Sequence, residues 1–334
     1  MESLVSIIIV NFNNNEYTLD CLKSLITQTY RNFEIILIDN ASKYEIYLNL
    51  KRDIAKFKKQ LNINLVRNNR CLYFSGGNNK GIKIARGKYI CLLNNDTEVE
   101  SNFIEKMIKF LEENKDAGMI SPKIKVFKNK NVIWYAGASI TLGKVFYTSH
   151  RGIWVNDPDN RMFSEIMKTD YATGAALFFP KEIIKKIGLL DEIYFMYSEE
   201  VDWNLRAKKE GFNIYYVPNT IVYHKVSKGI INKKIRRSLF KSYFYNRNSQ
   251  IFTWTHSKFR NLISFYLKYI FINIKYFASK LIKRELNSIY VQLFSIIQGF
   301  RIGVKRRTNQ SCQKELIKNF NFINNHVLKL YRPK

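Results

Sequence analysis

A buried strand pattern that runs into a cluster of polar side chains is the first place to look for chemistry. Tyr89–Leu93 is a short apolar run, typical of a strand buried on both faces, and Asn94, Asn95 and Asp96 follow it directly. Strands of an open α/β sheet bind ligands at their carboxyl ends, and a carboxylate flanked by amides can hold a hard cation. The alternative is a turn that leads into the N-cap of a helix near Ser101, because Asn and Asp suit both roles.

An acidic run later in the chain is a second candidate for chemistry. Glu199, Glu200 and Asp202 follow Ser198, a favourable N-cap residue, and acidic side chains suit the first turn of a helix. One interpretation is therefore a helix N-terminus stabilised by three carboxylates. The other is catalytic. Aromatic residues flank the run, and a carboxyl group beside apolar walls has a raised pKa, as a general base requires.

Two isolated residues add further signals. His224 ends the apolar segment Ile221–His224, where a histidine is more often structural than a ligand. Gly174 lies among alanines in Asp170–Phe179, so a ligand could approach the backbone closely there. Tight packing between elements explains the same small residues equally well, and both interpretations stay open.

A parallel sheet would bring these side chains to one edge, and the N-terminal pattern predicts such a sheet. Apolar strand patterns alternate with segments of helical spacing. This alternation predicts a doubly wound, mostly parallel α/β sheet whose strands end at the same edge. The predicted strands are Leu4–Val10, Phe33–Ile38, Ile63–Val66 and Tyr89–Leu93.

Each of these strands runs into polar residues, so the shared edge should bind a polar ligand. The polar residues that we place at this edge are Asn11, Asn13, Asp39, Asn40, Asn94 and Asn95. The second half of the chain is less regular. Trp134–Tyr147 predicts a hairpin or irregular strands. Asp170–Phe179 and Phe212–Val217 predict strands, and Lys181–Ile187 predicts a short helix.

The placement of glycines excludes a dinucleotide-binding domain. That domain needs G-x-G-x-x-G after the first strand, but Asn11–Asn15 contains no glycine. Gly76 and Gly77 follow the third strand, which is the wrong position. We therefore do not expect an oxidoreductase of this class.

Composition and charge divide the chain into two parts. The four cysteines are scattered without a CxxC pair, which argues against a zinc site or a disulfide framework and fits a reducing compartment. The N-terminus lacks a basic region before its apolar run, so we expect a strand there and not a signal peptide. Residues 226–334 carry 23 Lys and Arg against Glu285 and Glu315, whereas residues 1–225 have a net charge of only +7.

The basic tail predicts an anionic partner. Asn261–Lys283 and Ser288–Gly303 are apolar, but Lys268 and Lys275 interrupt the first segment, so it is too short to span a bilayer. We expect amphipathic helices in a membrane interface, with lysines facing phosphates. One alternative is that these helices pack on the rest of the protein. Nucleic-acid binding is the less favoured alternative, because no recognised binding motif accompanies the charge.

Seven segments in register over residues 5–225 resemble the family 2 inverting glycosyltransferases of the GT-A fold. The resemblance is greatest to their rhamnosyltransferase-like branch, and it does not extend with comparable strength beyond about residue 230. The segments are VSIIIVNFNN, FEIILIDNAS, FSGGNNKG, LLNNDT, YATGAA, FMYSEEVDWNLRAKKEGF and VPNTIVYHK.

The resemblance implies binding roles at the strand ends. The donor would be a nucleotide-diphosphate sugar, with Asn11, Asn13 and Asp39 at the base and ribose. Asp96 matches the last acid of the DxD-type motif and would ligate Mg²⁺ or Mn²⁺, with His224 able to add a ligand. The further residues assigned to substrate binding are Asn40, Gly76, Gly77, Asn78, Asn94, Asn95, Gly174 and Trp203.

The resemblance also implies a catalytic base. Glu200 matches that position and would take the proton of the acceptor hydroxyl during a single in-line displacement, while Glu199 and Asp202 would orient the acceptor or raise the pKa of Glu200. Two residues depart from the family pattern. Asn94 stands where the family has its first acid, and Tyr73 stands where relatives tend to have glycine.

The sequence therefore predicts a GT-A catalytic domain over residues 1–228 and a basic helical tail over residues 229–334. We expect a metal-dependent transferase that acts on a glycan or lipid-linked acceptor in cell-surface polysaccharide or glycoprotein glycan synthesis. We expect it in the cytoplasm, held peripherally at the inner membrane face. The alternative is a catalytically degenerate scaffold that serves as a polybasic membrane or nucleic-acid binding protein.

Overall fold

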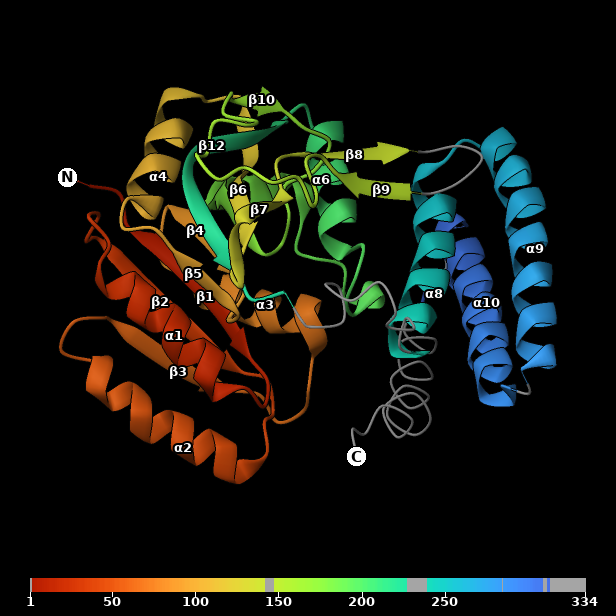
Figure 1. Cartoon of the computed structure of the whole chain (residues 1–334), viewed down its shortest axis with the longest axis horizontal. Coiled ribbons are helices and arrows are strands. Elements are labelled where there is room, and N and C mark those ends of the chain that lie inside the picture. The colour runs from red at the N-terminus through yellow and green to blue at the C-terminus, as the bar shows by residue number, and fades with distance from the viewer. Residues whose placement is uncertain (1, 142–146, 227–238, 284, 309–310, 313–334) are drawn as a thin grey trace. The chain divides into compact units, whose positions relative to one another are not determined.

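The computed structural model describes residues 2–141, 147–226, 239–283, 285–308 and 311–312. The chain divides into two compact units (Figure 1). The first comprises residues 1–139, 149–195 and 199–227, and the second comprises residues 140–148, 196–198 and 228–334.

The first half of the first unit alternates strands and helices, as predicted. A short 3₁₀ turn, η1, extends α2, and a short strand, β5, follows β4. The elements are β1 (Val5–Asn11), α1 (Asn15–Ile26), β2 (Phe33–Asp39), α2 (Tyr44–Ile54), η1 (Ala55–Phe57), β3 (Ile63–Arg67), α3 (Tyr73–Ile84), β4 (Tyr89–Leu93), β5 (Thr97–Val99) and α4 (Phe103–Glu113).

The chain from residue 117 to residue 224 consists mainly of strands, and residues 140–148 and 196–198 within it belong to the second unit. The strands are β6 (Ala117–Val126), β7 (Asn129–Tyr135), β8 (Ala138–Thr141), β9 (Tyr147–His150), β10 (Met167–Lys168), β11 (Ala176–Pro180) and β12 (Asn213–His224). The intervening helices are η2 (Lys181–Ile183), α5 (Ile184–Ile187), η3 (Glu192–Tyr194) and α6 (Glu199–Lys209).

These strands form one mixed sheet in the order β10-β12-β6-β11-β4-β1-β2-β3, and β8 pairs with β9 separately. β3, β2, β1 and β4 are mutually parallel, so their carboxyl ends share an edge. β11 is antiparallel to both β4 and β6, which makes the other half mixed. The predicted α/β class and the C-terminal helical region are confirmed.

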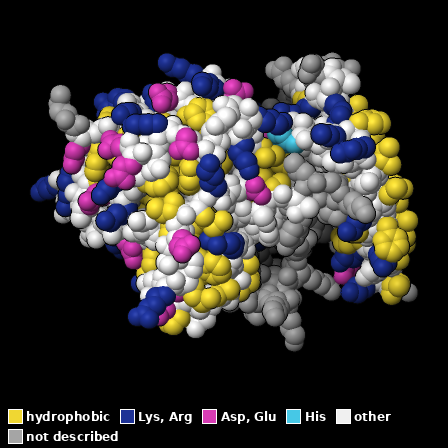
Figure 2. Space-filling view, turned by 90° about the horizontal axis from the view of Figure 1, so that it is seen from above, with side chains coloured by type: hydrophobic (Ala, Val, Ile, Leu, Met, Phe, Trp, Pro, Cys, Tyr) yellow, Lys and Arg dark blue, Asp and Glu magenta, His cyan; other side chains and the backbone are white. Residues whose placement is uncertain are grey.

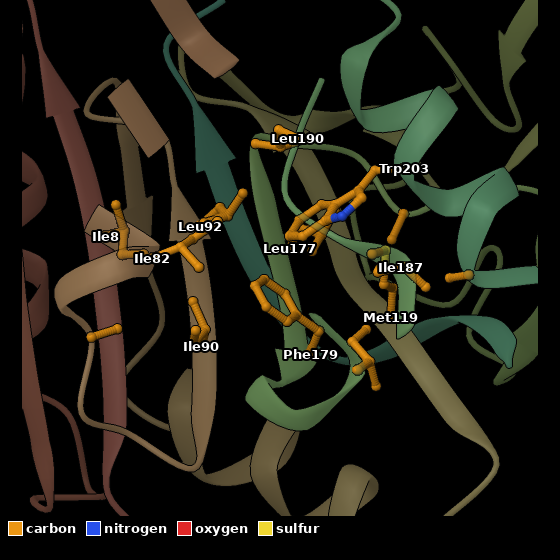
Figure 3. Close-up of a cluster of buried hydrophobic side chains, with 14 of the residues drawn as sticks. Ile8, Ile82, Ile90, Leu92, Met119, Leu177, Phe179, Ile187, Leu190 and Trp203 are labelled. Carbon is orange, nitrogen blue, oxygen red and sulfur yellow. The ribbon is translucent and has the colours of Figure 1, made fainter. Parts of the chain in front are cut away.

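The core of the unit lies between the sheet and the helices α3, α5 and α6. It contains aliphatic side chains from β1, β4 and β11, together with Trp203 of α6 (Figure 3). α3 lies close against β1, because a Cβ atom at Gly81 would be only 2.4 Å from Cγ2 of Ile8. Each fully buried aliphatic side chain of this kind contributes about 1.5–3 kcal/mol, so the core fixes the sheet edge on which the polar residues stand.

Two strand predictions need correction. The strand expected over Asp170–Phe179 begins only at Ala176. Before it, the backbone N–H and C=O of Ala172 bond to the side-chain amide of Asn204, at 2.9 and 3.0 Å, so a side chain replaces a strand partner. The strand expected to end at Val217 continues to His224, with a register shift around Pro218 that accommodates the missing N–H.

Among the residues of the second unit that the structure describes are three long helices, α8 (Leu239–His256), α9 (Phe259–Ile282) and α10 (Leu286–Arg307). The helices predicted in Asn261–Lys283 and Ser288–Gly303 therefore exist, each slightly longer than expected. In the ranges that the structure describes, none of the helices is both long and apolar enough to cross a membrane.

Candidate functional site

The carboxyl ends of β1 and β2 meet through buried polar side chains. Asn11 and Asp39 are register partners, both are fully buried, and Nδ2 of Asn11 donates to Oδ1 of Asp39 over 3.3 Å. Oγ1 of Thr18 donates to Oδ1 of Asn11 over 2.9 Å, which orients the amide. On the other side of Asp39, the Ser42 backbone N–H lies 3.3 Å from Oδ2 and Nε of Arg67 lies 3.7 Å from it. The sheet edge therefore holds a carboxylate compensated by one guanidinium.

The loops after β1 and β2 are tied to each other and to the loop after β3. Oδ1 of Asn13 accepts the Lys43 backbone N–H over 2.8 Å, and Asn13 has a positive φ of 54°. Oδ1 of Asn40 accepts the Leu72 backbone N–H over 2.8 Å, and its Nδ2 donates to the Tyr73 carbonyl over 3.0 Å. Asn13 and Asn40 therefore fix loop geometry at the sheet edge.

The start of α3 approaches this edge closely because its glycines lack side chains. A Cβ atom at Gly77 would lie 3.0 Å from Cγ1 of Val10, and one at Gly76 would lie 2.8 Å from Cβ of Leu72. Asn78 is buried, and its amide donates to the Phe74 carbonyl over 2.9 Å. The two glycines thus let the start of α3 pack closely against Val10 and Leu72.

Tyr73, which departs from the family pattern, adopts the left-handed backbone conformation that glycine favours, with φ of 53°. Its buried ring packs edge-on against Phe195, with centroids 5.2 Å apart. A non-glycine residue in this conformation costs roughly 1–2 kcal/mol. Ring packing therefore offsets the backbone strain, and this loop takes a conformation that a glycine at the same position could also adopt.

Strand pairing far along the chain brings His224 to the residues that follow β4. β12 runs antiparallel to β5, with His224 opposite Thr97. Nε2 of His224 consequently lies 3.1 Å from Oδ1 of Asp96, although the two residues are 128 positions apart in the chain. Asn95 is held nearby by a bond from its Nδ2 to Oγ1 of Thr18 over 3.0 Å. The Asn94 backbone bonds to the Ala175 carbonyl over 3.0 Å.

The Asp96–His224 pair is suited to an ionised carboxylate. Burial raises the pKa of Asp96, but His224 and Lys225 outweigh it, and the pKa lies below its ordinary value. About a quarter of the Asp96 side chain is exposed, and Nδ1 of His224 has no hydrogen-bond partner within the part of the chain that the structure describes. Over the same ranges no third Asp, Glu, Cys or His joins the pair.

These features fit a divalent cation that takes only some of its ligands from protein. A carboxylate oxygen suits Mg²⁺ or Mn²⁺, and Mg²⁺ commonly binds through one or two carboxylates together with substrate phosphates. The remaining ligands would come from a bound ligand and from water.

The acidic run forms the first turn of α6, in the first unit. It follows residues with positive φ, among them Phe195 at 62° and Ser198 at 74°, which marks a strained approach to the helix. The Oε2 atoms of Glu199 and Glu200 are buried and have no hydrogen-bond partner among the described residues. Buried oxygens without partners at a helix N-terminus are unusual, because that end offers free N–H groups.

The surroundings raise the pKa of both carboxyl groups. Burial raises the pKa of Glu199 well above its ordinary value, and the charge of Glu200 adds to the effect. Burial also raises the pKa of Glu200, although the backbone N–H groups of Glu200 and Val201 partly offset it. A carboxyl group of raised pKa is a better proton acceptor once ionised, so Glu200 has the property that a general base needs.

Replacing Glu199 with glutamine should stabilise the protein at alkaline pH. Because the folded-state pKa is raised above the ordinary 4.5, the unfolded chain releases the proton first as pH rises, and wild-type stability falls. Glutamine has no proton to lose, so we expect Glu199→Gln and wild type to match near pH 4. At pH 8 the variant should gain on the order of 1 kcal/mol.

Urea unfolding at both pH values measures this difference. Glu210→Gln is the matched control, because that carboxylate is exposed and its replacement should have no pH-dependent effect. The prediction is wrong if Glu199→Gln lowers the free energy of unfolding by the same amount at pH 4 and at pH 8, because the ionisation of Glu199 would then not affect stability.

Three of the predicted site residues have other contacts. Trp203 is fully buried in the core, where its Nε1 donates to the Gly188 carbonyl over 2.9 Å, so its role is packing and not substrate binding. A Cβ atom at Gly174 would lie 2.7 Å from Cζ of Phe74, which supports the tight-packing interpretation. Asp202 is buried and pairs with Nε of Arg206 over 2.8 Å, which suits orientation more than proton transfer.

Sequence reasoning missed several residues of the site. Nζ of Lys225 bridges Asp20 and Glu98, at 2.7 and 2.8 Å, beside the Asp96 backbone. Its place directly after His224 was the available signal. The ring of Trp134 lies 4.6 Å from that of His224, and no sequence signal linked these two.

Two solved structures with a similar fold are each less than 20% identical to this chain. GalNAc-T7 with UDP, GalNAc and Mn²⁺ superposes with a TM-score of 0.56 at 19% identity, covering 74% of this chain and 51% of that one. S. aureus TarS 1–349 in complex with UDP-GlcNAc gives 0.53 at 12% identity, with 92% of each chain covered. These likenesses show the GT-A fold.

Curated relatives match over shorter stretches. The Escherichia coli UDP-Glc:alpha-D-GlcNAc-diphosphoundecaprenol beta-1,3-glucosyltransferase WfaP is 35% identical over 112 residues, which is 34% of this chain and 43% of WfaP. The Haloferax volcanii low-salt glycan biosynthesis hexosyltransferase Agl10 is 26% identical over 214 residues, 63% of each protein. The matches thus span less than two thirds of these relatives.

A family model describes a larger continuous part of the chain. The model of glycosyl transferase family 2 matches residues 6–188, more than half of the sequence. The matched range includes the strand ends with Asn11, Asp39 and Asp96, which the fold gathers at one sheet edge. On the match and the fold together, the chain belongs to glycosyl transferase family 2.

Proposed function

We propose that this chain is an inverting glycosyltransferase. It moves a sugar from a UDP- or dTDP-linked donor to a hydroxyl of a glycan or lipid-linked acceptor, in cell-surface polysaccharide or glycoprotein glycan synthesis. The observation that carries the proposal is that one unit holds both an ionised carboxylate paired with an imidazole and a buried carboxyl group of raised pKa. Inversion in one step needs a leaving-group site and a base.

The donor nucleotide is assigned to the edge formed by β1, β2 and α3. Asn11 and Asp39, which bond to each other, are assigned to the base and ribose, and Asn13 and Asn40 fix the loops around them. Gly76 and Gly77, which pack the start of α3 against this edge, and Asn78 beside them in the same turn are assigned to the nucleotide as well. Asn94 and Asn95 continue this polar edge toward Asp96.

The acceptor side is assigned to the start of α6. Glu200 takes the proton of the acceptor hydroxyl as its oxygen attacks the anomeric carbon from the face opposite the leaving diphosphate. Glu199 lies beside Glu200 in the same buried turn, and the charge of Glu200 adds to the burial that raises the pKa of Glu199. Asp202, held by Arg206, is a positioning residue for this turn of the helix.

The diphosphate needs positive charge as it leaves. Asp96 and His224 would hold Mg²⁺ or Mn²⁺, which neutralises charge on the leaving diphosphate when bound. Lys225, although paired with Asp20 and Glu98, adds a fixed positive charge at the same strand end.

Relatives and neighbours support these substrate classes. The E. coli relative is named for a UDP-glucose donor and a diphosphoundecaprenol acceptor, and the archaeal relative is named for glycan biosynthesis. Two neighbours were solved with a nucleotide or nucleotide sugar and Mn²⁺. The seven motifs favour the rhamnosyltransferase-like branch, with residues 1–228 as the catalytic domain and residues 229–334 as the tail.

Thermal shift with a panel of UDP-, dTDP- and GDP-sugars, each with and without Mn²⁺, tests the donor class. A ligand that binds only the folded state stabilises it by about 2.7 kcal/mol at a hundred times its Kd, so a cognate donor should raise Tm by several degrees. We expect that rise with a UDP- or dTDP-sugar, and a smaller one without Mn²⁺. If no nucleotide sugar raises Tm in either condition, the scaffold is degenerate and the transferase proposal fails.

A further inference from the structure

The helical unit has an interior that is unusually polar for a soluble bundle. Gln250 of α8, Asn273 of α9 and Gln292 of α10 are all buried. They bond across helices, since Nε2 of Gln292 donates to Oδ1 of Asn273 over 2.7 Å and Nε2 of Gln250 lies 3.3 Å from the Tyr269 hydroxyl. Side-chain amides that bridge helices in this way are a common means of holding helices together in lipid.

α10 also packs on α8 through small residues. Cβ atoms at Gly299 and Gly303, four positions apart, would lie 2.7 Å from the Arg247 carbonyl and 2.3 Å from Cδ1 of Trp254. Helices with small residues four positions apart associate through close backbone packing and polar contacts. Such helices need few large apolar side chains at their interface.

Many apolar side chains of α9 and α10 are exposed, although Leu262, Phe265, Val291 and Ile302 are buried. Each helix has an exposed stripe of apolar residues at helical spacing, and Leu267 and Ile274 of α9 are 69% and 60% exposed. In Figure 2 yellow side chains gather along the right edge of the molecule, over α9, with dark blue ones among them. The stripes are Phe259, Ile263, Leu267, Ile270 and Ile274 on α9, and Leu286, Tyr290, Leu293, Ile297 and Phe300 on α10.

The charges beside these stripes are almost all positive. Neither helix contains an acidic residue, and residues 259–307 hold ten Lys and Arg against Glu285 alone. Lys268 and Lys275 follow the α9 stripe at its side, and Nζ of Lys275 lies 4.4 Å from the centroid of the Phe271 ring. The basic run Lys305–Arg307 ends α10.

We propose that the two stripes are the membrane-binding surface of the protein and lie in the interface of an anionic bilayer, with the helices parallel to it. Apolar stripes of this extent are costly in water, and lipid removes them from water while the flanking lysines reach phosphates. A second copy of the chain could also cover the stripes, but it would bring two strongly basic surfaces together. This proposal stands on the helical unit alone and does not depend on the transferase assignment.

Flotation of the full chain with vesicles tests the apolar stripes. We expect wild type to bind vesicles of phosphatidylcholine with phosphatidylglycerol. The α9 variant Leu267→Ser/Ile270→Ser/Ile274→Ser and the α10 variant Leu293→Ser/Ile297→Ser should each lower the partition coefficient at least about tenfold. The control Tyr44→Ser/Leu48→Ser removes exposed apolar side chains of the first unit and should leave the partition coefficient unchanged.

The charge component is separated by a second pair of variants. Lys268→Gln/Lys275→Gln should weaken binding to anionic vesicles and leave the weaker binding to pure phosphatidylcholine unchanged. The control Lys23→Gln/Lys109→Gln, at exposed sites of the first unit, should leave binding to both kinds of vesicle unchanged. Moderate salt should release only part of the protein, because salt screens the charges but not the apolar contacts. Complete release would overturn the role of the stripes.

A misfolded variant would also lose binding, so a tryptophan probe that gives a positive fluorescence signal on binding is a necessary second test. Leu267→Trp keeps the site apolar, and its fluorescence should shift to the blue on anionic vesicles and be quenched by brominated lipid, whereas Leu48→Trp should show neither change. An unshifted Leu267→Trp that still floats would overturn the proposal. The proposal would also be overturned if light scattering showed that the wild type is a dimer and that the serine variants are monomers. Binding to RNA without binding to anionic vesicles would overturn it as well.

Discussion

Replacing Glu200 with glutamine is expected to lower the rate of sugar transfer by about a hundredfold or more, which is the usual effect of losing a general base. Donor binding should be retained. Glutamine keeps the size of the side chain and removes the proton acceptor. In wild type, burial raises the pKa of Glu200, so transfer should increase as pH rises through that pKa and the base ionises. The variant should lose this limb of the pH profile.

Single-turnover transfer and donor titration by calorimetry measure the two quantities separately. Glu210→Gln, an exposed carboxylate after the other end of α6, is the matched control and should transfer at the wild-type rate. Near-wild-type transfer by Glu200→Gln would remove this residue from the mechanism. A large loss of donor affinity would instead place it at the nucleotide.

Replacing Asp96 with alanine should abolish the metal-dependent part of donor binding, with a loss of at least about a hundredfold in kcat/KM. The pKa of Asp96 lies below its ordinary value, so its carboxyl group is ionised, and no third acidic or histidine side chain joins the pair over the ranges that the structure describes. A cation site with so few protein ligands cannot retain its ion when the carboxylate is lost. Chelation by EDTA should reduce wild type to the level of the variant.

Glu98→Gln controls for the local change in charge. Glu98 lies in β5 two residues from Asp96 and bonds to Lys225 over 2.8 Å, so the substitution removes a nearby negative charge without touching the pair. In this control variant, Mn²⁺ should strengthen donor binding as it does in wild type. If EDTA leaves donor affinity and turnover of wild type unchanged, the cation proposal is wrong, and basic side chains must stabilise the diphosphate.

The sequence alone determined the parallel half of the sheet and the polar character of its edge. β-branched and apolar runs predict β1 to β4, because such residues are favoured in buried strands, and the Asn and Asp residues after them mark their carboxyl ends. Local pattern is enough here, since alternating strands and helices leave few possible topologies. The two amphipathic helices of the tail were predictable for the same reason.

Only the tertiary structure decided which distant residues meet. The pairing of β12 with β5 joins His224 to Asp96, and nothing in either local sequence encodes that register. The side chain of Asn204 takes the place of a strand partner for Ala172, so β11 starts late, and propensity cannot foresee such a substitute.

Burial was likewise a property of the fold and not of the sequence. Trp203 follows the acidic run by one residue, yet it faces the core, because the direction of a side chain on a helix depends on which face the sheet covers. In the tail, periodicity placed the apolar residues on one face of each helix. Which face turns outward was set by packing, where buried amides and glycines hold α8 to α10 together and leave the apolar stripes of α9 and α10 outside.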